Sequence, residues 1–196
     1  MMDQQELERY FRSLDRSFFV ENDMKKYAYL DAPLPIGFGQ TISQPSLVLE
    51  MTKILAPEKD SKVLEIGTGS GFQTAILAKI SDKVYTVERI EELMEKAKKR
   101  LEALEFSNIY FKVGDGSVGW EEYAPYDRIM VTAAAGVLPE ELVNQLATGG
   151  RMVIPIGPPG SQELKLITKR DDGNIITKTV EMVRFVELKG QYGWEE

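Results

Sequence analysis

Cysteine and histidine are both absent from the 196 residues of this chain. Without cysteine there can be no disulfide, no thiolate nucleophile and no cysteine-based zinc site. Without histidine the chain lacks the commonest general base and the commonest ligand of transition metals. Any chemistry therefore depends on carboxylates, hydroxyls, lysine, backbone groups or the substrate itself, and we expect no metal site.

The chain also lacks an excess of positive charge and any long apolar run. It has 24 Lys and Arg residues against 31 Asp and Glu residues, a formal net charge of −7. This balance argues against a broad binding surface for nucleic acid or an anionic membrane. It does not exclude a local basic groove. No stretch approaches the length of a membrane span, so we expect a soluble, cytoplasmic protein. The length suits one domain, and we expect a monomer.

From residue 61 onward, segments typical of strands and helices alternate. The expected strands are 62–66, 83–87, 108–113, 126–131 and 151–156, and the expected helices are 72–80, 90–104 and 139–146. Such alternation predicts an α/β, Rossmann-like fold with a mostly parallel twisted sheet and helices on both faces. Segments 163–168 and 175–186, joined through a turn at 171–174, predict antiparallel strands at the end of the chain.

The first 60 residues follow a different pattern, and we expect them to pack on the sheet core formed by residues 61–196. Residues 4–14 have the amphipathic spacing of a short docking helix. The segment 27–44 contains Pro33, Pro35, Gly37 and Gly39, which exclude a helix, yet it keeps apolar and aromatic residues that a solvated linker does not need. A helix is expected from Pro45 to about residue 55.

The most informative stretch is residues 63–71, with the sequence VLEIGTGSG. An apolar run leads into a glycine-rich turn and a helical pattern follows, which predicts a nucleoside-cofactor site at the carboxyl end of a buried strand. Glycines there avoid collision with a ligand and permit positive backbone angles. A dinucleotide fingerprint requires its third glycine at position 72, where this chain has Phe72. The spacing therefore favours S-adenosylmethionine over a nicotinamide cofactor.

Three acidic residues lie near this turn. Glu88 ends the second strand about 20 residues further on, where a carboxylate can accept hydrogen bonds from a ribose diol; alternatively it caps the following helix. Asp115 follows the third strand and can accept from an adenine amino group, or it is a plain turn residue. Glu65 precedes the glycines and can attract a sulfonium or an amino group.

Ser43 comes just before the helix that starts at Pro45. The simpler interpretation is a serine that starts a helix or a turn. The alternative is a hydroxyl that, together with exposed backbone amides, holds an anionic group of a substrate. The residue types alone leave both interpretations open.

Several motifs occur in order along nearly the whole chain. They are DAPLPIGFGQTISQP at 31–45, VLEIGTGSGFQTAILA at 63–78, VERI at 87–90, GDG at 114–116 and YDRIMVTAAA at 126–135. Together they resemble the motifs of protein-L-isoaspartate O-methyltransferases. The glycine loop is shared by many methyltransferases, whereas the segment with Pro-Ile-Gly and Thr-Ile-Ser-x-Pro is specific to this family.

The resemblance implies a single-domain class I methyltransferase that uses S-adenosylmethionine. Its substrates would be damaged proteins or peptides, methylated on the α-carboxylate of an L-isoaspartyl residue, after which the ester can collapse to a succinimide and reopen partly to aspartate. By the same resemblance Ser43 is the active-site serine. The implied cofactor-binding residues are Gln40, Thr41, Ile42, Glu65, Gly67, Gly69, Gly71, Glu88, Arg89, Gly114, Asp115 and Gly116, and the implied substrate-binding residues are Ile36, Gly37, Ser46 and Lys189.

Two positions depart from the family pattern. Family members usually carry His, or an aromatic residue in some bacterial forms, where this chain has Ser46. Near the end the family tends to read Val-Pro-Leu-Thr, where this chain reads Val186-Glu187-Leu188-Lys189. A lysine in place of the threonine can still pair with a carboxylate, as a less directional contact.

The composition fits carboxylate methylation, because an ionised carboxylate is already a nucleophile at neutral pH and needs neither general base nor metal. Three other functions stay open. They are a methyltransferase with a different carboxylate or small-molecule acceptor, a nicotinamide-dependent oxidoreductase, and a binding protein that has kept S-adenosylmethionine but lost catalysis.

Overall fold

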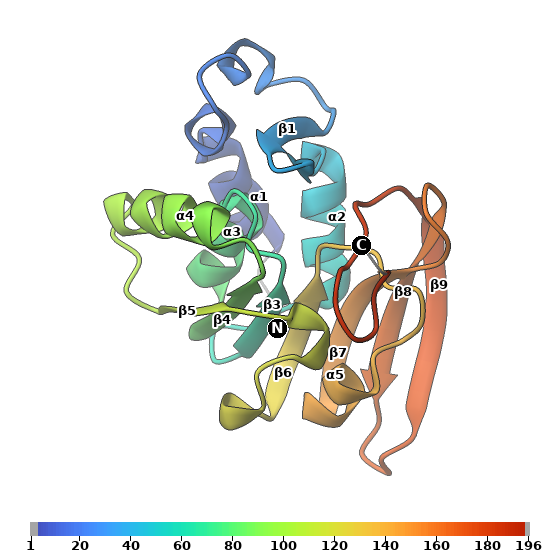
Figure 1. The fold of residues 1–196 in the computed structure, drawn as a ribbon. Coiled ribbons are helices and arrows are strands. Elements are labelled where there is room, and N and C mark those ends of the chain that lie inside the picture. The colour runs from blue at the N-terminus through green and yellow to red at the C-terminus, as the bar shows by residue number, and fades with distance from the viewer. Residues whose placement is uncertain (1–3, 195–196) are drawn as a thin grey trace.

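The structure, a computed structural model, describes residues 4–194, so the outermost residues of the expected 1–196 domain lie outside the described part of the chain. At its centre is a seven-stranded sheet in the order β5-β4-β3-β6-β7-β8-β9 (Figure 1). The strands are β3 (Lys62–Ile66), β4 (Lys83–Glu88), β5 (Ile109–Val113), β6 (Tyr126–Val131), β7 (Leu146–Ile156), β8 (Gln162–Lys169) and β9 (Ile175–Val183).

The pairing of these strands confirms a mostly parallel sheet with an antiparallel end. Strands β3 to β7 are paired in parallel, and β8 and β9 continue the sheet as an antiparallel meander. The chain builds outward from β3 in one direction through β4 and β5, then returns to the other side of β3 as β6. This reversal opens a crevice at the carboxyl ends of β3, β4 and β6, where ligands bind in such sheets.

Helices cover both faces of the sheet, as expected. They are α1 (Gln4–Ser13), α2 (Pro45–Leu55), α3 (Phe72–Ile80), α4 (Glu91–Ala103) and α5 (Glu140–Gln145). Because side chains alternate along a strand, β3 sends Val63 toward α2 and α3, and Leu64 and Ile66 toward the face that α5 covers. Helix α3 is buried all round except at Lys79, since α1 and α4 lie over its outer side.

The N-terminal segment is anchored on α3 by aromatic side chains. Phe11 and Phe19 both meet the ring of Phe72 edge to face, with ring centroids 6.0 and 5.3 Å apart. Such pairs each contribute about 0.5–1.5 kcal/mol beyond the area they bury. The segment loops away from the sheet, returns through β1 (Leu34–Gly37) and β2 (Gln40–Ile42), and enters α2 (Figure 1). It therefore forms one wall above the carboxyl ends of the strands.

Three parts of the chain differ from the sequence-based expectation. Strand β7 begins at Leu146 and not at residue 151, so it includes the last residue of the expected helix 139–146. Residues 34–42, expected only to be non-helical, form an antiparallel hairpin in which Leu34 pairs with Ile42. Strand β9 ends at Val183 and does not continue to residue 186. The chain leaves the sheet there because the amide of Phe185 donates to the Gln162 side chain at 2.9 Å, and the Ala134 amide then donates to the Val186 carbonyl at 2.8 Å.

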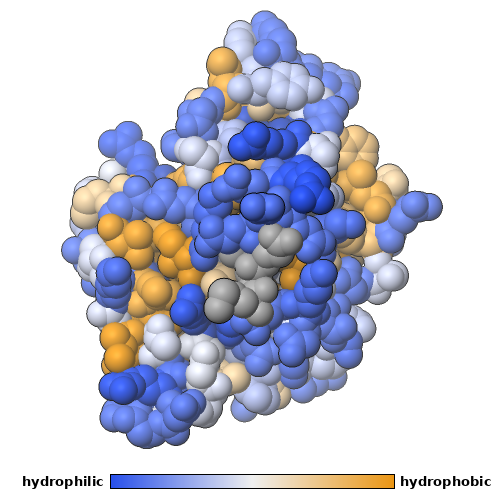
Figure 2. All heavy atoms as spheres, turned by 180° about the vertical axis from the view of Figure 1, so that it is seen from behind, coloured by the Kyte–Doolittle hydropathy of each residue, from blue (hydrophilic) through white to orange (hydrophobic). Residues whose placement is uncertain are grey.

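The face opposite to that of Figure 1 is mostly hydrophilic. Apolar residues gather at its left edge, the side on which β8 and β9 lie (Figure 2). There β9 leaves Ile175, Ile176 and Met182 exposed, as an edge strand with one open side does. No helix among residues 4–194 is long and apolar enough to span a membrane.

Candidate functional site

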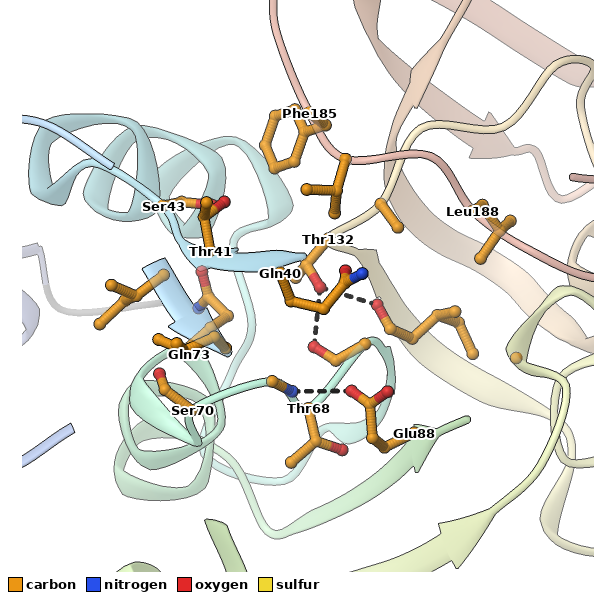
Figure 3. A pocket seen from close by; sticks show the side chains of 18 of the residues that line it. Gln40, Thr41, Ser43, Thr68, Ser70, Gln73, Glu88, Thr132, Phe185 and Leu188 are labelled. Atoms are coloured by element: carbon orange, nitrogen blue, oxygen red, sulfur yellow. Dashed lines mark hydrogen bonds between the residues drawn. The ribbon is translucent and has the colours of Figure 1, made fainter. Parts of the chain in front are cut away.

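A cleft of about 870 Å³, including its open mouth, lies at the carboxyl ends of β3, β4 and β6. Three parts of the chain line it: the ends of these strands, the segment from β1 to α2, and residues 185–189 near the C-terminus. Figure 3 shows Ser43 and Phe185 at one end of this cleft, with Thr68 and Glu88 at the other.

The glycine loop after β3 forms the floor of the cleft. Gly67, Gly69 and Gly71 all have positive φ, at 92°, 53° and 88°. A Cβ on Gly67 would lie 2.4 Å from the hydroxyl oxygen of Thr132, and one on Gly71 would press against Ala97 and Leu101 of α4 at 3.3 Å. Gly67 and Gly69 line the cleft, whereas Gly71 starts α3 and packs inward. The glycines therefore serve two purposes, a ligand-facing turn and a close helix contact.

Glu88 lies at the end of β4 and lines the cleft. Its carboxylate accepts hydrogen bonds from the Gly69 amide at 2.9 Å and the Ile90 amide at 3.0 Å. The second bond caps the start of α4, so the capping interpretation describes a real contact. Each carboxylate oxygen has a further lone pair, and the side chain is 7% exposed at the cleft. Capping and ligand binding are thus compatible at this residue.

Asp115 does not line the cleft. One carboxylate oxygen accepts from the amide and hydroxyl of Ser117 at 2.8 and 2.7 Å, and the other accepts from the Gln191 amide at 3.0 Å. A Cβ on Gly190 would lie 2.0 Å from this carboxylate, so the C-terminal segment packs directly against it. Gly116 lines the cleft, whereas the Gly114 amide donates a hydrogen bond to the Glu88 carbonyl at the end of β4, at 2.9 Å.

Glu65 is placed beneath the loop, away from the cleft. It points to the same face of β3 as Val63, where one carboxylate oxygen accepts from Thr74 and Thr86 at 2.6 and 2.7 Å. The other oxygen is buried without a hydrogen-bond partner. Burial raises the pKa of this carboxyl from 4.5 to about 8. The expected contact between Glu65 and a cofactor is not formed by this geometry, because the residue stands one position before the strand end and faces α3.

The N-terminal wall brings together most of the other expected residues. Ile36, Gln40, Thr41, Ile42 and Ser43 line the cleft. Arg89 lines it from the β4 side. Gly37 ends β1 and does not line the cleft.

Ser46 also lies outside the cleft, in the first turn of α2. Its hydroxyl accepts from the Gln44 side chain at 2.8 Å, and its amide donates to Asp31 at 2.8 Å. These bonds hold the start of α2, and the Ser46 amide lowers the pKa of the Asp31 carboxyl.

Residues 185–189 form the third wall. Glu187 pairs alongside Ala134 as a short parallel bridge, which fixes this segment over the end of β6. Lys189 lines the cleft as expected, and its ammonium forms an ion pair with Glu187 at 2.9 Å.

Sequence reasoning missed Glu187, Phe185 and Thr132 as cleft residues. Thr132 had a usable signal, because it directly follows β6 at the same sheet edge as Glu88.

The arrangement offers hydroxyls, amides, two carboxylates, one guanidinium and one ammonium around the cleft. Among residues 4–194 no group of three or more acidic side chains is placed to hold a metal ion. The hydroxyls, amides and charged groups that line the cleft can bind and align two reactants.

Comparison with known proteins agrees with this geometry. Residues 1–193 match the family model described as protein-L-isoaspartate(D-aspartate) O-methyltransferase. The chain is 55% identical over 183 residues to the protein-L-isoaspartate O-methyltransferase of Dictyoglomus thermophilum, covering 93% of this chain and 83% of that protein. It is 54% identical over 179 residues to the enzyme of the same name from Geobacter metallireducens, covering 91% and 83%.

Solved structures give the same likeness. A structure named protein-L-isoaspartate O-methyltransferase superposes with a TM-score of 0.83 at 28% identity, covering 97% of this chain and 67% of that one. A putative protein-L-isoaspartate O-methyltransferase from Plasmodium falciparum, in complex with S-adenosyl-L-homocysteine, gives a TM-score of 0.76 at 27% identity, covering 96% and 99%.

Proposed function

The chain belongs to the protein-L-isoaspartate(D-aspartate) O-methyltransferase family, and on this basis we propose that it is a protein repair enzyme. It transfers a methyl group from S-adenosylmethionine to the α-carboxylate of L-isoaspartyl residues in damaged proteins and peptides. The observation that carries the proposal is the family match over residues 1–193, because it spans the glycine loop and both substrate-side walls of the cleft.

The cleft residues fit S-adenosylmethionine. Gly69 leaves open space above the loop, where a Cβ would meet only Ile36, at 3.4 Å. Glu88 offers carboxylate lone pairs at the place where a ribose diol would lie. We assign cofactor binding to Gln40, Thr41, Ile42, Gly67, Gly69, Glu88, Arg89 and Gly116, all of which line the cleft. We assign a supporting role to four residues that do not line the cleft, which are Glu65, Gly71, Gly114 and Asp115.

The cofactor supplies a methyl group that its sulfonium already activates. The task of the chain is then to hold a substrate carboxylate in line with that group and to keep it desolvated. Good alignment can lower the activation barrier by up to roughly 7–11 kcal/mol. We assign the substrate side to Ser43 and Ile36 on one wall and to Lys189 on the other. Ser43 stands just before the start of α2, where a hydroxyl and backbone amides can hold an anion.

A different carboxylate acceptor is the alternative with a specific observation behind it. Glu187 and Lys189 stand where the family tends to have Pro and Thr, and they place an ion pair at the cleft. The enzyme is expected to act as a monomer in the cytoplasm, which light scattering of the purified chain and fractionation of its host would test.

A methyl-transfer assay with radiolabelled S-adenosylmethionine tests the function. An isoaspartyl peptide should be methylated, and its twin with a normal aspartyl bond should not. Methylation of neither peptide, together with tight binding of S-adenosylhomocysteine, would indicate another acceptor or a protein that has lost catalysis.

A further inference from the structure

Arg16 is a buried cation in the N-terminal segment of the chain. It begins the 3-10 turn η1 (Arg16–Phe19), directly after α1, and is only 4% exposed. Burying a charge is costly unless it is hydrogen-bonded, so the partners of this side chain indicate why it is retained.

The guanidinium of Arg16 donates only to backbone carbonyls. Nη1 donates to Ala28 at 2.9 Å and to Leu30 at 3.3 Å, while Nη2 donates to Ala32 at 2.8 Å and to Ser43 at 3.1 Å. The first three carbonyls belong to the loop before β1, and the fourth belongs to the serine at the cleft. One planar fork thus joins two segments that are 11 or more residues apart.

The bond to Ser43 fixes a peptide group at the cleft wall. Because a peptide is planar and trans, the direction of the Ser43 carbonyl also fixes the opposite direction of the next amide. The Ser43 side chain extends from the same residue, so this bond holds the backbone from which the hydroxyl projects. Asp31, whose charge acts on Arg16, accepts from the Ser46 amide at 2.8 Å, three residues after Ser43. Arg16 and Asp31 therefore both hold the chain where it passes from Ser43 into α2.

From this network we propose that Arg16 is a positioning residue for methyl transfer. It holds the segment around Ser43 in its position relative to the glycine loop. The proposal rests on the proposed function for its activity readout. A lysine cannot replace the guanidinium, since a single ammonium does not reach four carbonyls in a planar fork.

The test uses Arg16→Lys and Arg16→Met in the full chain, with Arg128→Lys as the matched control. Arg128 also donates to backbone carbonyls, those of Ala56 at 2.9 Å and Asp127 at 2.8 Å, but it lies at the amino end of β6, away from the cleft. Arg16→Met avoids leaving an unpaired buried charge if the lysine variant does not fold.

We expect kcat/KM for an isoaspartyl peptide to fall about 10–100-fold in both Arg16 variants, as for a small misplacement near the reacting groups. The Kd for S-adenosylhomocysteine should change less than threefold, and hydrogen exchange should quicken at residues 28–32 and 43–44 but not in β3 and β4. Arg128→Lys should lower the melting temperature without lowering kcat/KM.

Unchanged exchange at 28–32 and 43–44 in a folded Arg16 variant would overturn the proposal, as would equal losses of kcat/KM in the Arg16 and Arg128 variants. If the parent does not methylate the isoaspartyl peptide, the proposed function fails on its own. The exchange comparison then still decides whether Arg16 holds Ser43.

Discussion

The amide of Gly69 donates to the Glu88 carboxylate across 2.9 Å, which ties the glycine loop after β3 to the end of β4. The same carboxylate accepts from Ile90 at the start of α4. Glu88 therefore shapes the loop before any ligand arrives, and its remaining lone pairs face the cleft. Pre-formed geometry of this kind lowers the ordering cost of binding.

Replacing Glu88 with Ala should weaken binding of S-adenosylhomocysteine by roughly 1.5–3 kcal/mol, the range for hydrogen bonds to a charged group. Calorimetry measures this directly. Glu88→Gln should lose nearly as much, because its NH2 group would face either the Gly69 or the Ile90 amide, both of which are donors. Glu92→Ala, at an exposed position in the first turn of α4, serves as the control and should bind normally. Normal binding by Glu88→Ala would leave only the helix-capping role.

Ser43→Ala should depress turnover of an isoaspartyl peptide far more than it weakens cofactor binding, since the assigned partner of Ser43 is the substrate carboxylate. Steady-state kinetics and calorimetry on the same protein separate the two effects. Ser13→Ala, at the exposed end of α1, controls for the loss of a serine hydroxyl elsewhere. Equal losses in turnover and cofactor affinity would mean that Ser43 instead supports the loop or the cofactor.

Glu65 makes stability depend on pH. Its folded pKa of about 8 lies above the ordinary value of 4.5, so between these values the folded state holds a proton that the unfolded state has released. The contribution of Glu65 to the free energy of unfolding is then fully present below about pH 4.5. It is lost as pH rises toward 8, with a slope of at most about 1.4 kcal/mol per pH unit.

Glu65→Gln removes this titration while keeping an acceptor for Thr74 and Thr86. Urea unfolding from pH 5 to 8 should show the parent losing stability relative to the variant as pH rises. Parallel curves for the two proteins would show that the carboxyl is already ionised in the folded state.

The sequence predicted the fold well because its signals are local and repeated. Short apolar runs and a helical pattern place β3, β4, β6 and α3 to within a residue, since each element is defined by its own pattern. The end of β9 could not be placed in this way. Residues 185 and 186 are apolar like the strand before them, and only the hydrogen bond from the Phe185 amide to Gln162, a residue on another strand, shows where the strand stops.

The sequence predicted those residues of the candidate site that lie at strand ends. It did not predict residues whose role depends on the direction in which the side chain points. Glu88 and Gly67 follow from their positions at strand ends. Glu65 is one residue earlier, and its direction depends on the pleat of β3, so proximity in sequence to the glycines was misleading. Arg16 carried no signal, because its partners are backbone carbonyls of distant residues, which no side-chain pattern reveals.

The C-terminal wall gives the last prediction, which concerns the Lys189 and Glu187 ion pair. Both side chains are partly exposed, at 23% and 34%, so added salt screens their fields over about 8–10 Å. If Lys189 attracts the substrate carboxylate, KM for an isoaspartyl peptide should rise with salt, and Lys189→Thr should keep activity but flatten that dependence. Glu187→Gln removes the competing carboxylate and should lower KM at low salt while making its salt dependence steeper.

Glu163→Gln provides the matched control, because Glu163 pairs with Lys165 at 2.8 Å with the same two-residue spacing on β8, outside the cleft. It should leave KM unchanged at every salt concentration. A salt dependence that persists in Lys189→Thr would place the attraction on another cation. Activity that appears only in Lys189→Thr, from an inactive parent, would favour a different acceptor, because the family's threonine would then have restored what the lysine prevents.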